Sequence, residues 1–167
     1  MNRTLIQRCS PLLLAAVTAV AALATSLPTH AADTTPPAAP AADTLAPARA
    51  FIAKGQWRDA IAALQQVNDT GNADWNNLMG YSLRKAKTPD LAGAERFYNE
   101  ALRINPKHRG ALEYSGELYL MLGDLAKAEA RLAALSKVCT FGCEEFTDLK
   151  NAVAQFKANG NRYVAAP

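Results

Sequence analysis

Apolar and small residues recur at helical spacing in three segments of the chain that share one pattern. The segments are GQWRDAIAAL (55–64), PDLAGAERFY (89–98) and GDLAKAEARL (123–132). In and just beyond each segment, four matching positions fall at i, i+3, i+7 and i+10, which lie on one face of an α-helix. The pattern predicts three amphipathic helices that share the same arrangement of apolar positions.

The three helices repeat at an interval of 34 residues. This interval joins Ala60, Ala94 and Ala128, and it also holds for the three apolar columns around them. An alanine kept among larger apolar residues fits a point where two helix backbones approach closely, because a longer side chain would separate them. A generic helix bundle would need no fixed interval, so the pattern favours stacked helical repeats.

A second helix is predicted before each of these segments. ALEYSGELYLML (111–122) and DWNNLMGYSLRKA (74–86) place apolar residues on one side, and PARAFIA (47–53) is a shorter version. Gly80 and Gly116 stand inside two of these helices, where glycine costs about 0.5–1 kcal/mol relative to alanine. They therefore indicate close contacts at which no side chain fits.

This helix–turn–helix unit resembles the tetratricopeptide repeat. WNNLMGYSLRKAKTPDLAGAERFYNEALRINP (75–106) carries the resemblance best, and the whole domain is also similar to small exported tetratricopeptide proteins of Gram-negative bacteria. The resemblance implies an all-α fold in which antiparallel helix-turn-helix repeats stack as a short right-handed solenoid. The expected units are 47–70, 74–106 and 108–138.

Three departures from the family pattern stand out. The segment KAKTP in the middle unit indicates an insertion of two residues in its turn. Trp75 lies one place earlier than the usual tryptophan, which leaves its place in the core open. Thr140 follows the last unit where a proline is usual.

A final helix is predicted over CEEFTDLKNAVAQFKANG (143–160). Phe146, Leu149, Val153 and Phe156 line one side of it, and Gly160 can take the left-handed conformation that ends a helix. We expect residues 139–160 to form a disulfide loop and a cap over the apolar end of the last repeat. Residues 161–167 are expected to be a flexible tail.

The N-terminal region has the order of a secretory signal peptide. Arg3 and Arg8 precede the uncharged run LLLAAVTAVAALA, and small residues follow it up to Ala31. We expect residues 1–31 to be removed on export to the periplasm, leaving no stable membrane span; an uncleaved anchor is the alternative. Residues 32–46, rich in alanine and proline, are expected to be a disordered tether.

Charge and residue types argue against several function classes. The chain holds 18 basic and 15 acidic side chains, and loss of Arg3 and Arg8 would leave 16 and 15. A nearly neutral chain provides no basic field for nucleic acid. His108 is expected to be a surface loop residue, and no motif pairs a serine with a base. The sequence therefore predicts no catalytic residue, no cofactor and no enzyme activity.

Cys139 and Cys143 are the one group of residues in the predicted domain for which the sequence indicates specific chemistry. In an exported protein a disulfide is favoured, and closing so short a loop would contribute about 2 kcal/mol. A thiol pair that binds Cu(I) or Zn²⁺, or that is redox-active, is the alternative, and it would make the protein a metal or redox accessory. The CxxxC spacing lacks the further ligands of a zinc tetrahedron, so no metal site is predicted.

The tetratricopeptide resemblance also implies a groove that takes an extended peptide or a partner helix. Carried over by position, the groove residues are Arg49, Asn77, Tyr81, Arg84, Lys85, Glu113, Glu117 and Leu120. Arg84 and Lys85 beside Asn77 would suit a carboxylate of a peptide, and the two glutamates make the other end acidic. A solvated face that binds nothing is the alternative. The expected function is non-catalytic binding of a protein or peptide in the cell envelope, as a scaffold, with a homodimer left open.

Overall fold

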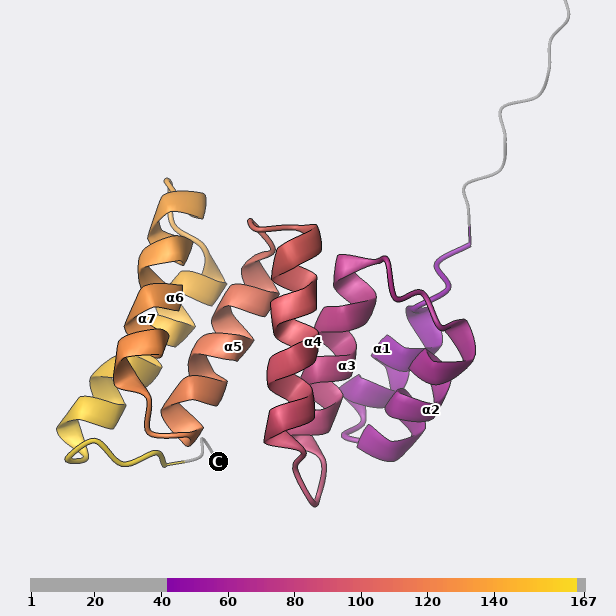
Figure 1. The fold of residues 1–167 in the computed structure, drawn as a ribbon, viewed down its shortest axis with the longest axis horizontal. Helices are drawn as coiled ribbons and strands as arrows, with labels where there is room; N and C mark the ends of the chain where they lie inside the picture. Colours follow the sequence, from indigo (N-terminus) through magenta and orange to yellow (C-terminus); the bar gives the residue numbers. More distant parts are fainter. Residues whose placement is uncertain (1–41, 165–167) are drawn as a thin grey trace, which may run out of the picture. The chain divides into compact units, whose positions relative to one another are not determined.

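The computed structural model describes residues 42–164, and these fold into seven α-helices without a strand. The helices follow one another as neighbouring pairs, as Figure 1 shows. Their bounds are α1 Ala46–Ala53, α2 Trp57–Val67, α3 Ala73–Lys85, α4 Leu91–Ile104, α5 Arg109–Met121, α6 Leu125–Val138 and α7 Glu144–Ala158. The expected all-α solenoid of helix pairs is confirmed. The predicted signal peptide and residues 32–41 of the expected tether lie outside the described residues.

The alanine column lies at the centre of the packing. Ala60, Ala94 and Ala128 are each 0% exposed, one in each of the second helices α2, α4 and α6. Each of these helices packs against the first helix of its own pair. The prediction that these methyl groups lie where helices meet is confirmed.

Polar side chains begin four of the helices. Asn72 accepts from the N–H groups of Asp74 and Trp75 at the start of α3, and Asp90 accepts from the N–H of Gly93 at the start of α4. Asp124 and His108 do the same for α6 and α5. These caps satisfy amide groups that have no partner within the helix.

The turns within the pairs confirm the insertion read from KAKTP. Three residues separate α1 from α2 and α5 from α6, whereas five residues, 86–90, separate α3 from α4. The two short turns use Gly55 and Gly123 with positive φ. The longer turn has no positive-φ residue and closes with a hydrogen bond from Asp90 N–H to the Leu83 carbonyl.

Trp75 belongs to the core despite its shifted place in the repeat. Its side chain is 4% exposed, and the indole N–H donates to the carbonyl of Leu64 at 2.7 Å. The ring also meets Phe97 edge to face, with centroids 5.7 Å apart. The indole is thus held between the first and second pairs, and the question left open by the sequence is settled.

The two glycines inside helices mark contacts that exclude a side chain. A methyl group at Gly80 would come within 2.8 Å of the Tyr98 ring, and one at Gly116 within 2.5 Å of Leu149. Leu149 is in α7, so the second contact seats the last helix on α5. The capping role expected for α7 follows from this contact and from Val153 and Phe156, which are buried in the same core cluster.

One boundary differs from the sequence expectation. Leu45, the penultimate residue of the expected tether, is 3% exposed in the core beside Ala48, and α1 starts at Ala46. At the other end, Tyr163 is 37% exposed and lines a small cavity together with residues of α5 and α7. The flexible tail stays a prediction.

Candidate functional site

The first helices of the pairs and α7 lie next to one another and form one face of the domain. α3 contacts α1 and α5, and α5 in turn contacts α7. We call this the inner face and define it by the side chains that carry its chemistry: Asn77, Tyr81, Arg84, Glu113, Tyr114, Glu117, Gln155 and Asn159.

An aromatic ladder crosses the inner face from one repeat to the next. Tyr81 meets Trp57 edge to face at 5.8 Å between ring centroids, and its other side faces Tyr114 at 4.6 Å. Both tyrosines are half-buried. Half-buried aromatic rings offer a large rigid contact area at low cost in side-chain entropy, which is why they recur as anchors of protein interfaces.

Arg84 lies behind the ladder with a partner already in place. Its guanidinium stands 5.5 Å from the Tyr81 ring centre and 5.6 Å from that of Tyr114, and it forms a 2.6 Å ion pair with Glu117. The side chain is 3% exposed. Burial lowers the pKa of Arg84, but the nearby Tyr98 and Glu117 outweigh it and raise the pKa. Arg84 stays charged and is neutralised inside the protein.

The predicted use of Arg84 as an open anchor for a peptide carboxylate therefore conflicts with its position. The side chain is almost inaccessible, and its strongest bond is to Glu117. Lys85, which was grouped with it, is exposed at the last residue of α3. The two cations do not act as a pair, because neighbouring residues of a helix point about 100° apart.

Asn77 is nearly buried and retains hydrogen-bonding capacity. It is 7% exposed, and its Oδ1 atom has no partner among the described residues. A methyl group at Gly110 would come within 3.2 Å of the Asn77 amide nitrogen, so the glycine leaves room for this side chain. Buried amide oxygens without a partner are rare, which makes Asn77 a candidate for binding a donor group of a ligand.

Glu113 carries the most displaced carboxyl pKa of the inner face. Burial, together with the nearby carboxyl groups of Glu117, Asp148 and Glu145, raises the pKa of Glu113 to about 8 against an opposing effect of Arg84. The residue is 7% exposed, and no ion pair or hydrogen bond of its carboxyl group is seen in residues 42–164. Near neutral pH the group is mostly protonated and can donate a hydrogen bond.

The remaining predicted groove residues divide between surface and core. Arg49 is exposed and lies 3.6 Å from Asp43 and 3.8 Å from Asp74. Leu120 is 1% exposed inside a core cluster with Leu135 and Leu149, so its placement on the groove surface is wrong. Its place in the helix turns it toward α6 and α7.

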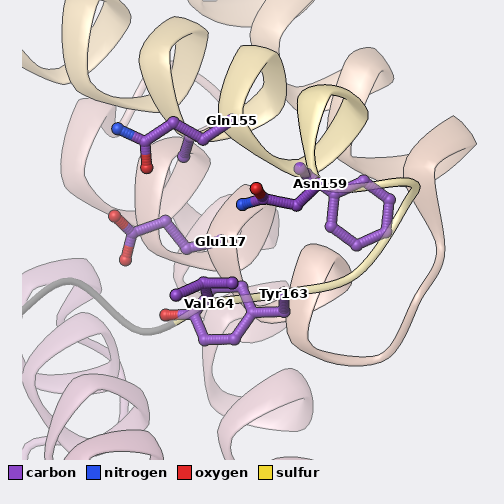
Figure 2. A pocket seen from close by; sticks show the side chains of 7 residues that line it. Glu117, Gln155, Asn159, Tyr163 and Val164 are labelled. Carbon is purple, nitrogen blue, oxygen red and sulfur yellow. The ribbon is translucent and has the colours of Figure 1, made fainter.

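Sequence reasoning did not assign four parts of this site: Tyr114, Gln155, Asn159 and the tail residues 161–164. Glu117 from α5 faces Gln155 of α7 and Asn159, which directly follows α7, across a cavity of about 50 Å³ that Tyr163 and Val164 close from the tail side (Figure 2). The spacing of Gln155 and Asn159, four residues apart at the end of α7, was the available signal. It could be used only once α7 was known to lie beside α5.

His108 is a structural residue and not the surface loop histidine that was expected. Its Nδ1 accepts from the N–H of Ala111, and its Nε2 lies 2.9 Å from Asp74. The side chain is 11% exposed. Nδ1 thus caps the start of α5, and Nε2 joins α5 to α3 through Asp74.

The cysteines form the disulfide favoured by the sequence. Cys139 and Cys143 are joined between the end of α6 and the start of α7. Glu145 lies near the two sulfur atoms, so the three residues could group around a metal ion if the bond were reduced. In the disulfide form the sulfur atoms are bonded to each other and offer no thiolate.

Comparison with known proteins supports the tetratricopeptide resemblance. The family model described as tetratricopeptide repeat matches residues 88–138, which span α4, α5 and α6 with their turns. No curated protein matches the chain. Within residues 42–164 no helix is both long and apolar enough to cross a membrane.

Proposed function

We propose that this protein is a non-catalytic scaffold of the cell envelope that binds a protein partner through an extended peptide on its inner face. The tetratricopeptide match suggests protein interaction in general terms. The aromatic ladder of Tyr81 and Tyr114 carries the proposal to this particular face.

The polar groups beside the ladder suit a peptide backbone. Asn77 Oδ1 is an acceptor without a partner among the described side chains, and protonated Glu113 is a donor. A backbone amide group has one donor and one acceptor, so both can be satisfied at once. Because Arg84 and Glu117 neutralise each other, we expect affinity to depend on aromatic and backbone contacts more than on the charge of the peptide.

The envelope location rests on the signal-like N-terminal sequence and on the cysteine pair. A disulfide persists in oxidising compartments and is rare in the cytosol. We place the mature protein in the periplasm on these grounds, as a scaffold without catalytic residues.

Crosslinking and pull-down from envelope extracts test the proposal. Wild type is compared with Tyr81→Ala, which removes one ring of the ladder, and with Arg103→Ala, which changes a side chain that is 72% exposed on α4. Binding at the inner face is supported if partners are recovered by wild type and by Arg103→Ala but are lost with Tyr81→Ala. Equal recovery by all three proteins would remove the inner face from the proposal.

A further inference from the structure

The chain reverses direction directly after α7 through a defined hydrogen-bond pattern. The N–H of Gly160 donates to the Lys157 carbonyl at 3.1 Å, and the N–H of Asn161 donates to the Phe156 carbonyl at 2.9 Å. Gly160 and Asn161 have φ of +66° and +61°. Paired bonds of this kind end a helix and fix the direction of the chain that follows.

The same ending occurs on two earlier helices, but with a different continuation. The turns after α1 and α5, at Gly55 and Gly123, have the same pair of bonds, and each is followed by the second helix of its pair. After α7, the tail takes the place that a second helix would have in the chain order. α7 is thus built like the first helix of a further repeat whose partner helix is replaced by residues 161–164.

The tail runs from α7 back toward α5 (Figure 1). Tyr163 and Val164 close the cavity that Glu117, Gln155 and Asn159 line from the helices (Figure 2). Burial raises the pKa of the Tyr163 hydroxyl, with Arg84 lowering it and Glu117 raising it. The tyrosine is therefore within the electrostatic reach of the Arg84–Glu117 pair at the centre of the inner face.

The docking is shallow enough to be reversible. Tyr163 remains 37% exposed and Val164 63% exposed, and neither takes part in a side-chain hydrogen bond within residues 42–164. A short segment held by two partly buried side chains is at the low end of local stability. A ligand that buries more surface would displace it.

We propose that residues 161–164 are an intramolecular ligand of the α5–α7 end of the inner face, and that partner peptides with an aromatic residue followed by an aliphatic one compete for this position. The inference rests on the proposed peptide-binding function and states which class of peptide the site would recognise. Tyr163 followed by Val164 is the pattern that the site already holds. The tail lowers the apparent affinity for such a peptide because the site is free only part of the time.

Nuclear magnetic resonance on the full-length protein tests this occupancy. Tyr163→Ala should shift the amide resonances of Glu117 and Gln155, which are distant in sequence but line the same cavity. Arg162→Ala, a change of the exposed neighbouring side chain in the same tail, is the matched control and should leave them in place. Unchanged Glu117 and Gln155 resonances in Tyr163→Ala would overturn the inference.

A synthetic peptide with the sequence ANGNRYVAAP, residues 158–167, then serves as the probe. We expect it to bind the Tyr163→Ala protein on the order of tenfold more tightly than wild type, since the site is no longer filled in cis. A peptide with the tyrosine replaced by alanine should bind neither. Equal affinity for the two proteins, or no binding to either at millimolar peptide, would overturn the inference. The pull-down with Tyr81→Ala is read independently, so the proposed function survives such a result.

Discussion

Asp74 and His108 stand 34 residues apart and meet at 2.9 Å, Oδ1 to Nε2. Each lies at the start of a first helix, α3 or α5, so the contact joins corresponding points of consecutive repeats. His108 also caps α5 through Nδ1. One side chain therefore caps the start of a helix and joins two consecutive repeats.

Replacing His108 by alanine should destabilise the domain. The variant loses the N-cap of α5 together with the contact to Asp74, for which we expect about 1–2 kcal/mol in the free energy of unfolding. Urea unfolding followed by circular dichroism measures it. His108→Asn restores a side chain suited to capping and should recover most of the loss; if it is as unstable as the alanine variant, capping is not the role of this residue.

Enlarging the small-residue column should disturb the packing between helices. Ala128→Leu inserts a longer side chain at a position that is 0% exposed, and overpacking of this kind costs about 1–3 kcal/mol. Ala130→Leu makes the same change at an exposed position of the same helix and is the control. Equal melting temperatures of the two variants would contradict the close approach of helices at Ala128.

Stability should fall with rising pH because of Glu113. Its pKa is raised to about 8, chiefly by burial, so the folded protein keeps a proton that the unfolded chain loses above about pH 4.5. By linkage the free energy of unfolding decreases as pH rises from about 4.5 to 8 and levels off above that. Glu113→Gln cannot titrate, so above pH 8 it should be more stable than wild type by about 1–3 kcal/mol.

Urea unfolding of wild type and Glu113→Gln at several pH values measures this difference. Below pH 4.5 the two proteins should be nearly equal, since the carboxyl group is then protonated in both states. Glu100→Gln alters an exposed carboxyl group paired with Arg103 and should leave the wild-type decrease in place. A gap between wild type and Glu113→Gln that does not widen with pH would show that Glu113 titrates normally.

Removing the disulfide should lower stability modestly. Cys139→Ser with Cys143→Ser opens a five-residue loop, for which the chain-entropy model gives about 2 kcal/mol. The loss should equal that of wild type under reducing conditions. Thiol titration of the oxidised mature protein should find no free thiol; two free thiols with bound metal would instead favour the metal or redox accessory.

Much of the fold could be predicted because the repeat is local in sequence. The 34-residue interval predicts the helix pairs. The alanine column and the glycines at 80 and 116 predict the places where helices come into contact. The residues of the candidate site could be assigned only from their positions within the repeat. Arg84 was assigned to the groove by its position in the repeat, but its burial and its ion pair with Glu117 depend on a residue from the next repeat.

The sequence by itself determined the helices and their pairing, since helical periodicity, caps and short turns act within a few residues of each other. The tertiary structure alone decided which polar groups are buried, so that Glu113 is protonated, Asn77 lacks a partner and His108 holds two helices together. It also decided that Tyr163 returns to the inner face. Burial and Coulomb interactions depend on distances between repeats, and those distances exist only in the folded domain.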